Sequence, residues 1–257
     1  MAFKTAAMAP NPRKKAGPFR RAAIAPNPRK KWAHKITREL HAFLKLRGIS
    51  VTSVRGMADL LITVGGDGTI LHEKEHCDLP IFGIGSETSF VCQARQKDWK
   101  KKLSAALASP RIEERSMLAS WLNGRRLEDA LNDVFVRNWD HRVLDFEVRA
   151  NGFSGKFMAD GVLFSTPTGS SAYAYSAGGR QLSPTARKYE IVGLAPYRRR
   201  FRPLVVDDKT ISRLIVNTRR QAFAVIDGQF SHRLKIGGNT LVVKKSGKRV
   251  PLLWWKK

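Results

Sequence analysis

The segment Leu60–Thr69, with the sequence LLITVGGDGT, constrains the fold of this chain more than any other. Its apolar half is typical of a strand buried in a parallel sheet. The glycines permit positive φ angles and let backbone N–H groups approach a ligand, and a helix can begin at Thr69, where free N–H groups favour an anion. The segment predicts a phosphate-binding turn with one carboxylate, Asp67, inside it. A tight turn that merely tolerates Asp is the alternative. The predicted phosphate-binding residues are Gly65, Gly66, Gly68 and Thr69.

A second motif, ADGVLFSTPTGSSAYAYSAGG, occupies residues 159–179. Residues 162–164 are typical of a short buried strand, and a turn rich in hydroxyl groups and small residues follows. Residues 170–177 can form a short helix that offers the aromatic faces of Tyr173 and Tyr175. Such a surface suits a ligand that needs many hydrogen bonds and close backbone approach. A flexible Ser/Thr linker is the alternative, but linkers rarely lie between buried strands.

Together, the two motifs resemble those of the NAD kinase family. Further matching pieces lie at residues 24–30, 131–134, 194–196, 202–204 and 227–229. The resemblance covers about residues 22–245, which is nearly the whole chain. It implies phosphoryl transfer from ATP or polyphosphate to the 2′-hydroxyl of the adenosine ribose of NAD, which gives NADP.

The predicted fold class is an α/β N-terminal domain with a parallel sheet plus a mainly-β C-terminal domain. Strands and helices alternate in the first half, as in a parallel sheet flanked by helices. After about residue 113 the pattern is mainly β, with hairpin turns at Asn123-Gly124 and Asn151-Gly152. The expected organisation is a basic, disordered tail at 1–21, a phosphate-donor domain at 22–108, a dinucleotide-binding domain at 109–235 and a segment at 236–257 that returns toward the first domain.

The charge of the chain is strongly positive, with a formal net charge of +26 and no acidic residue before Glu39. Such a field concentrates anionic substrates and binds nucleic acid or acidic lipid without specificity, so it predicts no specific nucleic-acid partner. Part of the tail, residues 9–15, recurs at residues 25–31, where it precedes an amphipathic helix. No apolar run reaches the length of a membrane span, and Cys77 and Cys92 are expected to be reduced thiols. A cytoplasmic location is therefore predicted.

A zinc-protease pattern, HExxH, occurs at His72–His76. On a helix, its two histidines would share a face and could bind a metal. Lys74 and Glu75 make the stretch strongly polar, however, whereas a catalytic zinc helix packs inside its domain. A surface helix with two incidental histidines is the preferred interpretation, and no metal-ligating residues are assigned.

In the implied reaction, Asp67 would orient the 2′-hydroxyl and accept its proton, while the glycine turn holds the donor phosphates. Mg²⁺, or another divalent cation, would neutralise the donor phosphates. The residues that match NAD-binding positions of the family are Phe90, Asn132, Asp133, Asp160, Thr168, Ser171, Ala172, Tyr173 and Ser176. Asp227 is expected to structure a turn with Gly228.

Two departures from the family pattern affect this assignment. The family usually has Glu where Asp133 stands, so the carboxylate reaches less far. The loop at residues 83–90, GIGSETSF, is one residue shorter than in the family and lacks its Asn. Contacts of this loop, and discrimination between NAD and NADH, therefore stay open.

Two other classes of protein are alternatives. A lipid kinase of the diacylglycerol or sphingosine kinase type also uses a Gly-Gly-Asp-Gly turn, but it lacks the 165–173 segment. A non-enzymatic nucleic-acid-binding protein would explain the charge but not Asp67 among glycines. The sequence does not distinguish ATP from polyphosphate as the donor. By family resemblance, we expect a homo-oligomer, a dimer or a tetramer.

Overall fold

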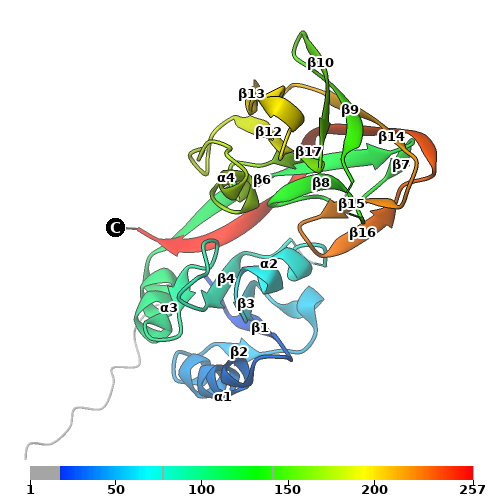
Figure 1. Cartoon of the computed structure of the whole chain (residues 1–257). Helices are drawn as coiled ribbons and strands as arrows, with labels where there is room; N and C mark the ends of the chain where they lie inside the picture. The colour runs from blue at the N-terminus through cyan, green and yellow to red at the C-terminus, as the bar shows by residue number, and fades with distance from the viewer. Residues whose placement is uncertain (1–17, 77, 141, 257) are drawn as a thin grey trace, which may run out of the picture.

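The computed structural model describes residues 18–76, 78–140 and 142–256, which form two lobes (Figure 1). The first lobe contains β1 (Arg21–Pro26), α1 (Lys31–Lys45), β2 (Ser50–Val51), a 3₁₀ helix (Arg55–Met57), β3 (Leu60–Val64), α2 (Asp67–Glu73), β4 (Ile81–Gly85), β5 (Ala94–Arg95) and α3 (Trp99–Ala108). The second contains β6 (Pro110–Leu122), β7 (Arg125–Arg126), β8 (Asp133–Asn138), β9 (Leu144–Ala150), β10 (Phe153–Ala159), β11 (Gly161–Ser165), a 3₁₀ helix (Gly169–Ser171), α4 (Tyr173–Ser176), β12 (Lys188–Leu194), a 3₁₀ helix (Tyr197–Arg199), β13 (Leu204–Asp207), β14 (Ser212–Thr218), β15 (Ala222–Ile226), β16 (Phe230–Arg233) and β17 (Gly237–Trp255).

Two sheets organise these elements. The larger runs β10-β9-β14-β17-β4-β3-β1-β2, and its β1, β3 and β4 pair in parallel. The long strand β17 pairs in parallel with β4 and antiparallel with β6 and β14, so it belongs to both lobes. The smaller sheet runs β13-β12-β11-β8-β15-β16 with antiparallel pairing. The predicted fold class, α/β followed by mainly β, is confirmed.

Local sequence explains several elements. Helix α1 buries Ala33, Ile36, Leu40 and Leu44, which recur with the helical period along one face. Both predicted hairpin turns are confirmed: φ is 50° at Asn123 and 84° at Gly124, and the Asn151-Gly152 turn that joins β9 to β10 has φ of 46° and 78°. Positive φ at both central residues is the requirement of a type I′ turn, which Asn-Gly meets at little cost.

The boundaries differ from expectation at two places. The predicted tail ran to residue 21, but Phe19 is buried in the core and Arg21 opens β1; residues 1–17 lie outside the described residues. Helix α2 begins at Asp67, earlier than predicted, and ends at Glu73. The domain boundaries themselves stay a prediction.

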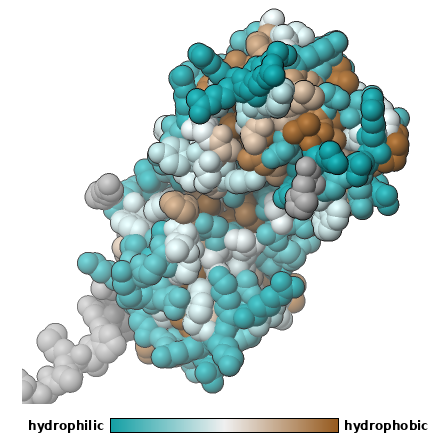
Figure 2. All heavy atoms as spheres, in the orientation of Figure 1, coloured by the Kyte–Doolittle hydropathy of each residue, from teal (hydrophilic) through white to brown (hydrophobic). Residues whose placement is uncertain are grey.

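The surface in Figure 2 is largely hydrophilic over the lower lobe, where α1 and α3 lie, whereas hydrophobic residues gather on the upper lobe. The core between the two sheets of the upper lobe is continuous and contains Phe146, Phe164 and Leu241. No helix of the described residues is long and apolar enough to cross a membrane.

Candidate active site

The glycine turn lies at the carboxyl end of β3. The Gly65 N–H donates to the carbonyl of Ile84 at 3.0 Å, which fixes the turn against β4. A Cβ on Gly65 would lie 2.3 Å from Thr69 Oγ1 and 2.5 Å from Asn27 Cβ, and Gly66 has φ of 112°. Only glycine fits both positions. The Lys30 ammonium donates to the Gly65 carbonyl, which places a cation beside the turn.

The Asp67 carboxylate accepts three backbone hydrogen bonds. Oδ2 accepts from the Phe90 N–H at 2.6 Å, and Oδ1 accepts from Val91 and Cys92, both at 3.0 Å. Burial and the neighbouring Asp67 charge raise the pKa of the Cys92 thiol, which keeps it in its neutral form. The carboxylate is therefore held in one orientation between α2 and the loop that follows β4.

This loop is the segment in which the sequence departs from the family pattern. The Arg95 guanidinium holds its shape by donating to the carbonyl of Cys92 at 2.8 Å and to the carbonyl of Ser89. With these carbonyls turned toward Arg95, the amides of residues 90–92 face Asp67. Phe90 remains 70% exposed beside the carboxylate and is free to contact a ligand.

The second motif packs against residues 131–133. The Thr166 N–H donates to the Asn132 carbonyl at 2.9 Å, and the Thr166 hydroxyl donates to the Leu131 carbonyl. Asn132 Oδ1 and Thr168 Oγ1 are buried without a hydrogen-bond partner among the described residues. Unpaired buried polar atoms are uncommon in folded proteins, and a ligand is one way to satisfy them.

Gly169 makes the closest backbone approach of this region, because a Cβ there would lie 2.1 Å from the Asn132 carbonyl oxygen. We expect Gly169→Ala to lower the free energy of unfolding by about 1–3 kcal/mol, since both backbones must move apart. The matched control is Gly247→Ala, where a Cβ would meet no atom within 4 Å. Urea unfolding of both variants measures the effect, and equal stabilities would contradict this account.

Asp227 lies in a tight turn after β15, with φ of 51°, followed by Gly228 with φ of 64°. Its carboxylate accepts the backbone N–H groups of Leu131 at 2.9 Å, Asn132 at 2.7 Å and Asp133 at 3.0 Å. It therefore builds the segment that carries two predicted NAD-binding residues, a role beyond the local turn that the sequence suggested. Burial raises the pKa of Asp227, although the nearby Lys74 charge opposes the shift.

Asp133 is buried beside Asp227, and burial together with the Asp227 charge raises its pKa from 3.8 to about 7. The pKa of Asp133 is therefore higher in the folded protein than in the unfolded one. Its contribution to the free energy of unfolding is fully present below pH 3.8 and is lost as the pH rises through about 7. Relative to Asp133→Asn, the wild type should lose a few kcal/mol of unfolding free energy between pH values of about 4 and 8. Denaturant unfolding of both proteins across this range measures the difference, which would be flat if Asp133 titrated normally.

The structure brings most predicted site residues together. The Asp227 turn also reaches the first motif, because Gln229 Nε2 lies 3.7 Å from where a Cβ of Gly68 would sit. Tyr173 is 42% exposed and packs edge-on against Phe135, with ring centroids 5.5 Å apart. Ser171, Ala172 and Ser176 lie in or beside the short helices that follow Thr168. Asp160 is separate: it precedes β11, whereas the hydroxyl-rich turn of the motif begins at the far end of that strand, at Ser165.

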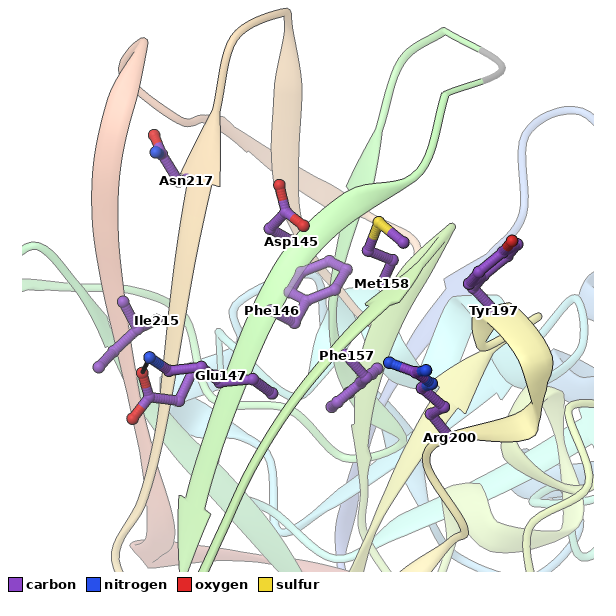
Figure 3. A pocket seen from close by; sticks show the side chains of 10 residues that line it. Asp145, Phe146, Glu147, Phe157, Met158, Tyr197, Arg200, Ile215 and Asn217 are labelled. Atoms are coloured by element: carbon purple, nitrogen blue, oxygen red, sulfur yellow. Dashed lines mark ion pairs between the residues drawn. The ribbon is translucent and has the colours of Figure 1, made fainter.

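Hollows elsewhere on the surface do not coincide with this site. A hollow of about 380 Å³ lies on the outer face of β9, β10 and β14, lined by Met158, Tyr197, Arg200 and Ile215 among others (Figure 3).

The zinc-protease pattern at His72–His76 places two histidine rings near each other without further ligating side chains among the described residues. The His72 and His76 ring centroids lie 5.2 Å apart, and residues 18–76, 78–140 and 142–256 contain no group of three or more ligating side chains. Lys74 within this pattern is buried rather than exposed as predicted.

Comparisons with known proteins identify the family. The model of the ATP-NAD kinase C-terminal domain matches residues 131–253. The NAD kinase of Methanosarcina mazei is 36% identical over 76% of this chain and 71% of its own length, and that of Thermoplasma volcanium is 33% identical over 84% and 80%. The chain therefore belongs to the NAD kinase family.

Solved structures share the fold. An NAD kinase from Archaeoglobus fulgidus in complex with ATP superposes with a TM-score of 0.76 at 24% identity, covering 92% of this chain and 93% of that one. A yeast NADH kinase complexed with NADH superposes with a TM-score of 0.80 at 21% identity, covering 93% and 84%. At these identities, the likeness establishes the two-lobed fold.

Proposed function

We propose that this protein is an NAD kinase that transfers the terminal phosphoryl group of ATP or polyphosphate to the 2′-hydroxyl of the adenosine ribose of NAD. The basis for this activity is that the chain belongs to the NAD kinase family. The observation that carries the site assignment is the single carboxylate, Asp67, held inside the glycine turn and close to the Asp227 turn that supports residues 131–133. A donor phosphate at the glycine turn and a dinucleotide at residues 131–133 and 165–176 would then meet at Asp67.

Asp67 has the capacity for the proposed role. A carboxylate has about four acceptor positions, and backbone N–H groups take three of them here. The remaining position, on Oδ2, can accept the ribose hydroxyl and later its proton. In a loose phosphoryl-transfer transition state that proton leaves late, so a carboxylate held in one orientation matters more than a strong base.

The donor set of the site fits Mg²⁺ carried by the phosphates. Mg²⁺ keeps several waters and is commonly bound by one or two carboxylates plus substrate phosphates. Because the ribose hydroxyl would take the last acceptor position of Asp67, the donor phosphates and waters would hold the ion here, beside Asp67 rather than bound to it. When bound, the ion neutralises charge on the phosphates. The residues of the turn orient the donor, and Asn132, Thr168 and their neighbours orient the dinucleotide.

The position of Asp160 supports a homo-oligomer. It is exposed and lies the length of β11 away from Ser165, roughly 16 Å at 3.3 Å per residue, so it is accessible to a dinucleotide bound to a second copy of the chain. Light scattering after size exclusion tests this, and a monomer would leave Asp160 without a role.

We also propose that the protein is located in the cytoplasm, where NAD and the phosphoryl donors occur.

The activity is tested with purified protein, NAD and Mg²⁺, with ATP and polyphosphate supplied in parallel reactions. We expect NADP with at least one donor and none after chelation of the metal. The donor that works decides between ATP and polyphosphate. Folded protein that makes no NADP with either donor would refute the proposal, and lipid acceptors would be tried next.

A further inference from the structure

Lys74 is a buried cation between the two lobes. It directly follows α2, the helix that begins with Asp67, and its side chain is 0% exposed. The ammonium donates to the Asp129 carbonyl and pairs with the Glu75 carboxylate. It also lies 3.3 Å from Asp227 Oδ2, and the Asp227 side chain is likewise 0% exposed. One side chain of the first lobe therefore contacts two points of the second.

The contacts continue from Asp227 into the dinucleotide site. The Asp227 carboxylate accepts hydrogen bonds from the backbone N–H groups of residues 131–133. The carbonyls of Leu131 and Asn132 in turn accept hydrogen bonds from Thr166. An unbroken series of polar contacts thus joins the helix of Asp67 to both segments that carry predicted NAD-binding residues.

Burial of an ammonium and a carboxylate is poorly explained by stability alone. The desolvation penalty of a buried ion pair commonly equals or exceeds its Coulomb energy, and an apolar residue of similar volume often stabilises equally well. An ion pair does fix two elements in one relative geometry. Phosphoryl transfer needs such a geometry, because a misplacement of about 1 Å can reduce the rate by about 10²-fold.

We propose that Lys74 is a positioning residue that sets the Asp67 carboxylate at the correct distance from the ribose hydroxyl, by joining α2 to Asp227. This inference rests on the proposed function through the role of Asp67. Lys74 touches neither substrate; it acts through the two segments that it connects.

The first test is Lys74→Met, which keeps the length of the side chain and removes its charge. We expect kcat to fall by about 10- to 100-fold, while KM for NAD and for the donor changes less than about threefold. The matched control is Lys100→Met, because Lys100 pairs with Glu39 at the surface and is 59% exposed. If Lys74→Met does not fold, Lys74→Gln, which removes the charge but keeps a hydrogen-bond donor, is measured in the same way.

A double-mutant cycle with Asp67→Asn separates positioning from a general structural role. In the Asp67→Asn background, Lys74→Met should change kcat by less than about threefold, since the carboxylate that it positions is absent. The same fold-loss in both backgrounds, or wild-type kcat in Lys74→Met, would overturn the proposal.

Hydrogen exchange distinguishes failure of this inference from failure of the proposed function. Without substrates, the amides of residues 131–133 should exchange faster in Lys74→Met than in Lys100→Met, because Asp227 loses its partner. Faster exchange in Lys74→Met, together with a wild type that makes no NADP, would uphold the link between the lobes and refute the kinase. Unchanged exchange would refute the link itself.

Discussion

Replacing Asp67 with asparagine is expected to lower kcat for NADP formation by about 10²- to 10⁴-fold, the range in which a positioned acid or base contributes. Asparagine keeps the size of the side chain but loses one acceptor oxygen and the capacity to take a proton. NAD should still bind, because residues 131–133 and 165–176 are unchanged. Steady-state kinetics and calorimetric titration with NAD measure the two effects separately.

Asp67→Asn also disturbs the loop at residues 90–92, whose backbone N–H groups donate hydrogen bonds to the carboxylate. Arg95→Met controls for this, since it removes the guanidinium that holds the Ser89 and Cys92 carbonyls and leaves the Asp67 carboxylate in place. We expect this control to lose about tenfold or less in kcat. Turnover of Asp67→Asn within about threefold of the wild type would remove Asp67 from the mechanism.

Replacing Asp227 with alanine is expected to have the largest effect on stability, a loss of about 3–5 kcal/mol in the free energy of unfolding. The change leaves the Lys74 ammonium buried without this partner and leaves the amides of residues 131–133 without their acceptor. Urea unfolding of both proteins at one fixed pH measures the loss, because stability also depends on pH through Asp133.

The control for Asp227 is Asp207→Ala, at the exposed end of β13, where its carboxylate accepts the Lys209 N–H at 2.9 Å. A surface substitution of this kind should change stability by about 0.5 kcal/mol or less. If both variants lost the same small amount, Asp227 would not be the structural centre of the dinucleotide site.

Features set by neighbouring residues could be predicted from the sequence. The turn at Gly65–Gly68, the amphipathic helix that follows Lys30 and the hairpin turn at Asn151-Gly152 each follow from local φ preferences or from a hydrophobic period. The positions of the two motifs could also be recognised, because both consist of short, unusual combinations of small and polar residues.

Contacts between distant residues could not be predicted in the same way. Asp227 binds backbone amides 94 to 96 positions earlier in the chain, and no local pattern encodes that pairing. Lys74 indicated a solvated helix, since a lysine is almost never fully buried unless it is paired. Two of its three partners, Asp129 and Asp227, lie in the other lobe. The first half of β6 has no strand pattern in the sequence, because Arg111, Glu113 and Arg115 resemble a polar loop, although β17 pairs with it along its length.

The measurement that tests the central claim most directly compares NAD with 2′-deoxyadenosine NAD as acceptors, with Mg²⁺ and the active donor present. The proposed chemistry predicts that NAD becomes NADP, identified by an NADP-specific dehydrogenase, and that the deoxy analogue binds but receives no phosphate. Phosphorylation of the deoxy analogue, or no transfer to NAD by folded protein, would contradict it.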